Sequence, residues 1–135
     1  MSKTLNGEII PGERIGDYYL GWSFNTLKEH LTKDFQIEDR GQKLVITDQN
    51  MKFWLDKENN SITQISVFGE FKGRFKGVIG IGSNLTDVQR RVGKWEEELD
   101  VYIMPDFPGI CFELLDEEDW DEWKSPIEFI SIYKD

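Results

Sequence analysis

The sequence predicts an α+β domain in which two tandem helix–β-meander units form a mostly antiparallel sheet with the helices on one face. Two observations carry this prediction. A glycine, a capping residue and an apolar stretch of helical period occur together at 21–31 and again, 61 residues later, at 82–92. Short β-branched and aromatic segments, separated by turn residues, follow both stretches. One such unit is too small to cover its own sheet, whereas two units can share a sheet and bury both helices.

The first residues of the chain favour turns more than regular structure. Pro11-Gly12 and Ile15-Gly16-Asp17 mark two turns, and short strands are expected at 8–10 and 18–20. We therefore interpret residues 1–19 as an irregular lead-in to the first unit.

The first helix is expected over about 24–34. Ser23 stands at the N-cap position, where its hydroxyl can accept a hydrogen bond from a free backbone N–H of the first turn. Phe24, Leu27 and Leu31 then recur at helical spacing, while charged residues occupy the other faces. This pattern indicates a helix that buries one side on the sheet.

Polar residues at 36–42 predict a loop, and the strands of the first unit follow it. They are expected at 44–47, 51–55 and 62–68, where β-branched and aromatic residues are frequent and turn residues separate the segments. The glycine-punctuated basic segment 71–76 then leads into the second unit.

The second helix is predicted between Asn84 and Gly93. Asn84 takes the N-cap position, and Asp87 lies in the first turn, where the helix dipole favours a carboxylate. Leu85, Val88 and Val92 would form the buried face, and Gly93 suits the position that follows a helix. Strands are expected after this helix at 101–104, 110–115 and 127–133.

The strand sequences repeat as well. Residues 53–55 resemble 112–114 at a separation of 59, and residues 65–68 resemble 130–133 at a separation of 65. Because helix and strand matches occur in the same order, we predict a single domain over the whole chain. Its parts are the lead-in 1–19, a first repeat unit 20–78 and a second repeat unit 79–135.

Composition predicts a soluble protein of the cytoplasm. With 135 residues, five Trp and nine Phe, the chain has enough apolar material to build a core without staples. No apolar run approaches the roughly 20 residues of a membrane span, and the first eight residues lack the apolar region of a secretory signal. A single cysteine excludes an internal disulfide.

The net charge of −10 comes entirely from the second half of the sequence. Residues 1–78 carry 11 acidic and 11 basic side chains, whereas residues 79–135 carry 15 acidic and 5 basic ones. Such a surface repels nucleic acids and anionic membranes and attracts basic partners. A general contribution of acidic residues to solubility is the alternative explanation.

No catalytic, cofactor-binding or metal-binding residues are predicted. His30 is the only histidine and lies beside the apolar stripe of the first helix, and Cys111 lies within a strand, where a buried structural thiol is expected. The glycines at positions 77, 80 and 82 match neither a dinucleotide-binding nor a P-loop pattern. A pair of carboxylates is the one catalytic device open to a chain with 26 acidic residues.

The most unusual stretch of the chain combines acids with tryptophan. Six acids surround two tryptophans over 116–123, without the central glycine and alternating acids of an EF-hand loop, and a similar combination follows the second helix at 95–100. Carboxylates would steer a basic partner, and exposed tryptophans would supply the contact area that interface hot spots favour. A solvated loop whose tryptophans fold back onto the sheet is the alternative. The predicted partner-binding residues are Trp95, Glu96, Glu97, Glu98, Asp100, Asp116, Glu117, Glu118, Asp119, Trp120, Asp121, Glu122 and Trp123.

The sequence resembles a known repeat architecture. Leu20-Gly21-x-Ser23-x-x-x-Leu27, followed by Phe53-x-Leu55 and Ile65-x-Val67 and then repeated, looks like tandem copies of the β-lactamase-inhibitor-like fold. Outer-membrane assembly lipoproteins of the BamE type carry a single copy of this fold. The present sequence has no lipidation cysteine near its start, so the resemblance does not imply an envelope role.

The fuller layout is similar to small bacterial immunity proteins, which neutralise contact-dependent or secreted toxins. It consists of the Pro11-Gly12 lead-in, the first unit, a glycine-rich connector over 71–77 and the stretch 79–83. This resemblance and the acidic charge predict an immunity protein, not an enzyme, that binds a basic toxin domain, expected to be a nuclease. The alternatives are a non-catalytic scaffold or regulatory domain that holds a peptide or subunit on its open sheet, and a carboxylate-based hydrolase.

Overall fold

The computed structural model describes residues 7–134, and within that range the chain forms two short helices and twelve strands. The helices are α1 (Phe24–Lys28) and α2 (Leu85–Arg91). The strands are β1 (Glu8–Ile10), β2 (Arg14–Ile15), β3 (Tyr18–Tyr19), β4 (Gln36–Arg40), β5 (Lys43–Asp48), β6 (Met51–Asp56), β7 (Ser61–Phe68), β8 (Arg74–Phe75), β9 (Glu96–Glu98), β10 (Val101–Ile103), β11 (Ile110–Leu114) and β12 (Ile127–Tyr133).

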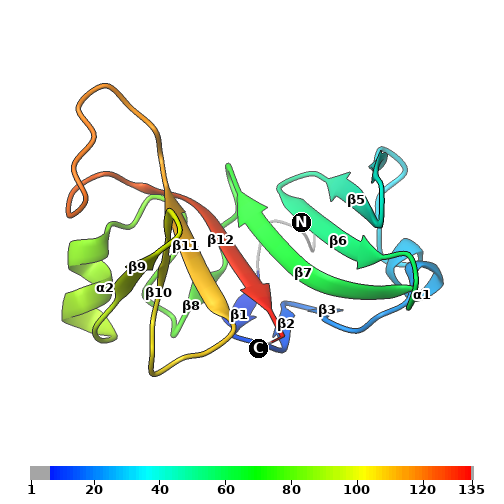
Figure 1. Ribbon diagram of the computed structural model, residues 1–135, viewed down its shortest axis with the longest axis horizontal. Coiled ribbons are helices and arrows are strands. Elements are labelled where there is room, and N and C mark those ends of the chain that lie inside the picture. Colours follow the sequence, from blue (N-terminus) through cyan, green and yellow to red (C-terminus); the bar gives the residue numbers. More distant parts are fainter. Residues whose placement is uncertain (1–6, 135) are drawn as a thin grey trace.

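These strands build a large sheet and a small one (Figure 1). The large sheet has the order β4-β5-β6-β7-β12-β11-β10-β9, and all its neighbours are antiparallel. The small sheet has the order β3-β2-β1-β8, in which only β1 and β8 are parallel. The prediction of an α+β fold with mostly antiparallel strands is therefore confirmed.

The large sheet is joined at its centre by β7 and β12, which are 65 residues apart in sequence at Ser66 and Ser131. These serines lie opposite each other, both are buried, and their hydroxyl oxygens are 2.5 Å apart. On either side of them, Ile65 pairs with Ile132 and Val67 pairs with Ile130. The serine pair is thus the middle one of the five residue pairs in this register.

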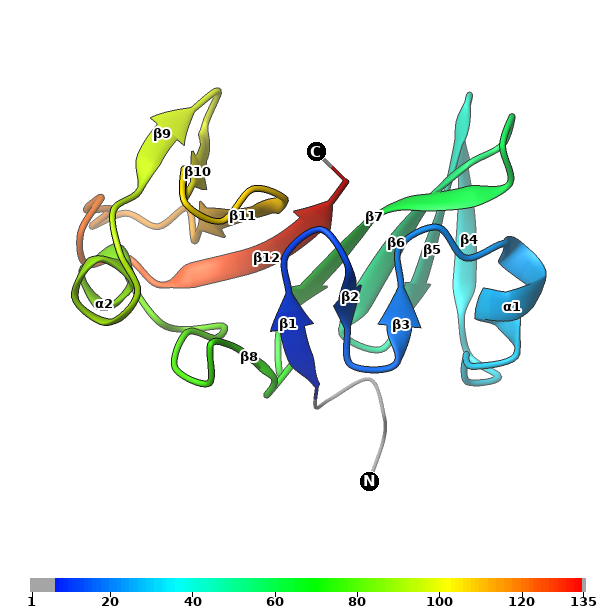
Figure 2. The same cartoon turned by 90° about the horizontal axis from the view of Figure 1, so that it is seen from below.

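Both sheets and both helices contribute to one hydrophobic core. The alternation of strand side chains places Phe53, Ile65 and Ile130 on its inner face, and all three are fully buried. Leu27 of α1 and Leu85 of α2 belong to the same cluster. Fully burying one such side chain contributes roughly 1.5–3 kcal/mol. Figure 2 shows β1, β2 and β3 in front of the central strands, with α1 and α2 at opposite ends of the molecule.

The lead-in is more regular than the sequence predicts. Strands at 8–10 (β1) and 18–19 (β3) are present as expected. Strand β2 lies between them and pairs with both, so residues 8–19 form three strands of the small sheet. The basic segment 71–76 supplies the fourth strand, β8. A Cβ atom on Gly73 would lie 1.8 Å from the Gly7 carbonyl oxygen, so this close parallel contact requires glycine. Residues 1–6 of the predicted lead-in lie outside the described part of the chain.

The prediction of a helix over 24–34 is wrong in its length. The N-cap is correct, because the Ser23 hydroxyl accepts a hydrogen bond from the Thr26 N–H. The helix ends at Lys28, however, and the Thr32 N–H donates to the carboxylate of Asp48 at 2.8 Å. A buried side-chain acceptor on the sheet thus replaces the helical hydrogen bonds, which helical periodicity in the sequence does not reveal.

The prediction of a loop over 36–42 is also wrong, since residues 36–40 form the edge strand β4. All five of its residues are exposed, so its sequence carries no alternation of apolar and polar side chains. Strand β9, at the opposite edge, is likewise exposed and consists of three glutamates. Each half of the large sheet therefore has four strands, one more than the sequence predicts.

No helix within residues 7–134 combines the length and the apolar character needed to cross a membrane.

Candidate partner-binding surface

The two acidic segments predicted to bind a partner lie side by side in the structure. The ring centroids of Trp95 and Trp123 are 4.7 Å apart. The Tyr102 hydroxyl, on β10, donates a hydrogen bond to the Glu122 carboxylate at 3.1 Å. Residues 95–100 and 116–123 therefore form one surface, although they are separated in sequence by two strands of the large sheet.

Trp95 lies between this surface and the hydrophobic core. Its indole N–H donates to the Leu85 carbonyl oxygen of α2 at 3.2 Å, and its ring makes an edge contact with Tyr102 at 5.5 Å. Trp95 is partly buried against the core, whereas Trp123 packs on it from outside and keeps 45% of its surface exposed. The fixed position of Trp95 thus orients Trp123.

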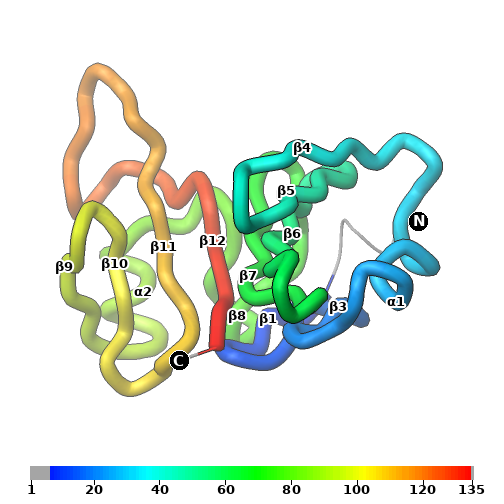
Figure 3. Tube along the Cα trace, turned by 45° about the vertical axis from the view of Figure 1, so that its right-hand side comes forward, coloured from blue at the N-terminus to red at the C-terminus, as the bar shows by residue number. Residues whose placement is uncertain are grey.

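The loop between β11 and β12 is ordered by its own acidic side chains. The Asp121 carboxylate accepts hydrogen bonds from the backbone N–H groups of Trp123 and Lys124 at 2.8 and 3.0 Å. The Ser125 hydroxyl accepts from the Asp121 N–H and donates to Glu117 at 3.3 Å. Asp121 and Glu117 are therefore committed to the shape of the loop, which projects beyond the sheet (Figure 3).

Other predicted residues line a pocket of about 440 Å³ between the two segments. Trp120 is 49% exposed and forms one wall. Within residues 7–134, the three carboxylates of the pocket make no ion pair or hydrogen bond. The pocket thus combines uncompensated negative charge with an accessible aromatic ring. It is lined by Glu97, Asp100, Tyr102, Leu114, Asp116 and Trp120.

The structure does not bring all predicted residues to this pocket. Successive side chains of a strand point to opposite faces, so Glu96 and Glu98 lie on the other side of the sheet from Glu97. Glu98 lines a separate pocket with Phe107 and Tyr133. Glu118, Asp119 and Glu122 remain on the loop; the first two are exposed and Glu122 holds Tyr102.

Burial fixes the protonation state of two groups on the large sheet. Burial, assisted by the hydrogen bond to Glu122, raises the pKa of Tyr102 to about 12, so this hydroxyl stays a donor at neutral pH. Burial raises the pKa of the Cys111 thiol to about 11, which keeps it un-ionised and poorly nucleophilic. Cys111 is 8% exposed, as expected for a structural thiol.

His30 and Glu113 are two further groups with the chemistry of a catalytic residue. The His30 Nδ1 atom lies 3.0 Å from the Thr26 carbonyl oxygen, and its ring packs on Trp22 at 4.6 Å, which indicates a packing role. Burial, with a smaller contribution from Glu128, raises the pKa of Glu113. A carboxylate-based hydrolase would depend on two neighbouring carboxylates such as Glu113 and Glu128. Among the described residues, no group of three or more His, Cys, Asp or Glu side chains could hold a metal ion.

Leu99 is a surface feature that the sequence did not single out. It stands at the tip of the β9–β10 hairpin with 92% of its surface exposed. Both turn residues, Leu99 and Asp100, have positive φ angles of 50° and 70°. Leucine has no side-chain group that favours this conformation, whereas two-residue turns of this kind favour Asn and Gly. The two-residue gap between β9 and β10 would have revealed the turn if β9 had been recognised.

Comparison with known proteins identifies the fold only. No protein-family model matches the sequence, and no curated protein matches it significantly. The structure is similar to the crystal structure of the uncharacterized protein yfeY from Escherichia coli, with a TM-score of 0.57 and 12% sequence identity. The match covers 97% of this chain and 99% of that chain, so the two proteins share an architecture over their whole described length.

Proposed function

We propose that this protein is an immunity protein that binds and neutralises a basic toxin domain, a nuclease, through an acidic Trp surface. This surface is defined by the pocket residues Glu97, Asp100, Asp116 and Trp120 together with Trp123. The observation that carries the proposal is a pocket that combines the exposed Trp120 with three carboxylates that have no ion pair within residues 7–134. The exposed Trp123 is linked to this pocket through the ring contacts of Trp95 with Trp123 and with Tyr102.

The chemistry of nucleases explains why such a surface would inhibit one. A nuclease attracts phosphate groups into a basic cleft, and carboxylates held at comparable spacing can occupy that cleft instead. Opposite charges also accelerate association, while buried aromatic anchors slow dissociation. In this proposal, the carboxylates raise the association rate, and Trp120 and Trp123 lower the dissociation rate of the complex.

The proposal includes the compartment and the architecture. The protein acts in the cytoplasm, where the toxin meets its target. The two halves of the large sheet, each preceded by a short helix, are tandem copies of one unit, with both helices on one face. Ser66 and Ser131 pair with each other and occupy equivalent positions of the similar segments 65–68 and 130–133, and Leu27 and Leu85 lie in one core; both observations support this interpretation.

Co-expression with a toxin tests the function. The toxin domain encoded beside this protein should arrest growth alone and be harmless with the wild-type chain. The triple charge reversal Glu97→Lys, Asp100→Lys and Asp116→Lys should abolish protection and weaken the affinity, measured by calorimetry, by at least 100-fold. Its control is Glu29→Lys, Glu58→Lys and Glu70→Lys, which changes the net charge equally at exposed positions of the other half.

Two outcomes would contradict the proposal. The first is a toxin partner whose binding surface is acidic. The second is unchanged affinity in the triple variant at positions 97, 100 and 116 while its fold is intact. A protein partner that is no toxin, bound at the same surface, would instead favour the scaffold or regulatory alternative, and a toxin gene adjacent in the genome would argue against that alternative.

A further inference from the structure

A basic segment precedes the acidic C-terminal part of the chain. Residues 71–95, which include β8 and α2, carry six basic side chains and a single acid, Asp87. Residues 96–135 carry 14 acidic and two basic side chains. The molecule therefore has a strong local charge separation, and the acidic Trp surface uses only its negative side.

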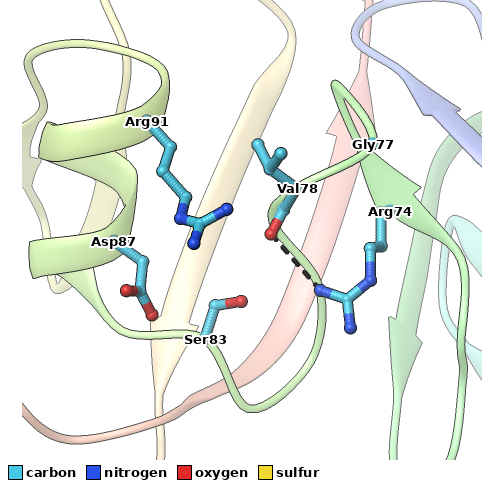
Figure 4. A pocket seen from close by; sticks show the side chains of 6 residues that line it. All are labelled: Arg74, Gly77, Val78, Ser83, Asp87 and Arg91. Atoms are coloured by element: carbon cyan, nitrogen blue, oxygen red, sulfur yellow. Dashed lines mark hydrogen bonds between the residues drawn. The ribbon is translucent and has the colours of Figure 1, made fainter.

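Two arginines of this segment face each other across a pocket of about 360 Å³. Figure 4 shows the guanidinium groups of Arg91, from α2, and Arg74, from β8, pointing into the pocket from opposite sides, with the Ser83 side chain between them. Gly77, Val78 and Asp87 complete the wall. The pocket thus has hydrogen-bond donors on two sides and at its base.

Most of these donors are free. Arg74 donates one hydrogen bond, to the Val78 carbonyl oxygen at 3.3 Å. Arg91 makes no hydrogen bond or ion pair within the described part of the chain. The Ser83 hydroxyl oxygen accepts from the Gly80 N–H at 3.1 Å, which leaves its own proton available to donate.

The one acid of the pocket caps α2 and forms no ion pair with the arginines of the pocket. The Asp87 carboxylate accepts a hydrogen bond from the Asn84 N–H at 3.1 Å, and the Asn84 side chain accepts from the Asp87 N–H at 2.9 Å. This reciprocal cap holds Asp87 at the start of α2. No basic side chain among residues 7–134 lies within ion-pair distance of it.

The wall that carries Arg74 is fixed by a tight turn. The Phe75 and Ile79 backbones exchange hydrogen bonds, and both side chains are buried. A Cβ atom on Gly80 would lie 3.4 Å from two Arg74 side-chain atoms and 3.2 Å from the Gly73 carbonyl oxygen. A side chain at position 80 would therefore pack tightly against both the backbone and the Arg74 side chain of this wall.

We propose that this pocket binds a phosphate group, either inorganic phosphate or the phosphate of a small monoester. Two guanidinium groups can each present paired N–H donors to tetrahedral oxygens, and the Ser83 hydroxyl supplies a further donor. None of the six lining residues is aromatic, so nothing in the wall would stack on a nucleobase. The site is separate from the acidic Trp surface and is independent of the immunity function.

Titration of the ¹⁵N-labelled full-length protein tests the site. Inorganic phosphate and glycerol phosphate are added in separate experiments at constant ionic strength, with sodium chloride as the reference. Saturable NMR shifts are expected at Arg74, Val78, Ser83 and Arg91, including the arginine side-chain Nε–H signals. A stronger response to glycerol phosphate identifies a monoester ligand, and an equal or weaker response identifies free phosphate; both outcomes support the site.

Matched arginine variants decide whether the pocket is responsible. Arg91→Gln and Arg74→Gln should each weaken phosphate binding at least 10-fold, whereas Arg90→Gln should leave it within twofold. Arg90 is the adjacent exposed residue on α2 and does not line the pocket. Its variant changes the net charge by the same amount as the other two and therefore controls for a general effect of charge. Equal weakening by all three variants, shifts that chloride reproduces, or binding retained in Arg91→Gln would overturn the proposal. Thermal unfolding of each variant confirms that its fold is intact.

Discussion

The two halves of the large sheet each consist of four consecutive strands, but the charged side chains at their outer edges are arranged differently. At the β4 edge, Arg40 pairs with Glu38 at 3.0 Å and Lys57 pairs with Asp39 at 2.7 Å. At the β9 edge, the glutamates of residues 96–98 form no ion pair within the described part of the chain. Charges at the first edge are thus paired within the protein, whereas the glutamates of the second edge leave it with a net negative charge.

The connections between strands differ in the same direction. Strands β6 and β7 are joined by the four residues 57–60, whereas β11 and β12 are joined by the twelve residues 115–126. The longer connection carries Trp120, Trp123 and Asp116, which is one of the three acids of the acidic Trp surface. The two halves therefore differ most in their edge strands and in the length of one connection, and loops are where binding residues are most often found.

The largest expected effects test whether the two halves support the fold equally. Phe53 on β6 and Phe112 on β11 are both fully buried in the shared core. Phe53→Ala and Phe112→Ala should each lower the free energy of unfolding by about 3–5 kcal/mol, because each leaves a large cavity. Urea denaturation measures both values. A difference above about 2 kcal/mol would mean that one half dominates the stability.

The serine pair at the junction of the halves should show a smaller, coupled effect. Ser66→Ala or Ser131→Ala leaves the remaining buried hydroxyl with fewer partners, at a cost of about 1–3 kcal/mol. The double variant should cost less than the sum of the single variants, because it removes both groups together. A double-mutant cycle by urea denaturation measures this coupling. Strictly additive costs would contradict the direct hydroxyl contact.

The edge hairpins provide a matched pair of opposite sign. Gly41, in the β4–β5 turn, has a φ of 78° and no atom within 4 Å of its would-be Cβ, so Gly41→Ala should destabilise by roughly 1 kcal/mol through backbone strain alone. Leu99→Asn, in the β9–β10 turn, should stabilise by a similar or smaller amount, since Asn tolerates positive φ. Thermal unfolding compares the two. Destabilisation by Leu99→Asn would show that Leu99 makes stabilising contacts.

The smallest expected effects are differences in pH dependence. The hydrogen bond from Lys57 lowers the pKa of Asp39 below its ordinary 3.8, so its contribution is present above pH 3.8 and is lost as the pH falls through the lowered value. Burial raises the pKa of Glu113 above its ordinary 4.5, so the ionised group destabilises the fold at neutral pH.

Two neutral variants separate these contributions. Asp39→Asn should lower the stability at pH 7 and have no effect at the acid end, whereas Glu113→Gln should raise it at pH 7, with the gain shrinking as the pH falls towards 4.5. Stability curves at several pH values measure both, and Glu58→Gln is the exposed control. Parallel curves for wild type and Glu113→Gln would contradict the raised pKa.

Local sequence patterns predicted the elements that bury an apolar face. Strand β7 shows alternation and β-branched residues, and both helices begin at the predicted caps, Ser23 and Asn84. The edge strands β4 and β9 were missed because neither has a buried face to mark it. The small sheet was missed as a unit because β1 pairs with β8, which is more than 60 residues away in sequence.

The candidate surfaces were predictable only in part. Composition alone located the acidic segments at 95–100 and 116–123, but their contact depends on the long-range packing of Trp95 on Trp123. The pocket between Arg74 and Arg91 likewise joins residues from β8 and α2. The sequence does not show that the nearby Asp87 caps the helix and forms no ion pair with these arginines. Residue types thus indicated which side chains could bind a ligand or partner, and the fold determined which of these side chains lie close together.

The serine junction also has a consequence for how the sheet assembles. Within each half, neighbouring strands are close in the chain and can pair as soon as they are made. The junction cannot, because β12 follows every other strand in the chain. During synthesis, the edge of β7 that later pairs with β12 therefore remains without a partner strand until β12 has been made. An unpaired strand edge can associate with other chains. Slow synthesis between residues 68 and 127 is thus expected to increase aggregation of the nascent protein.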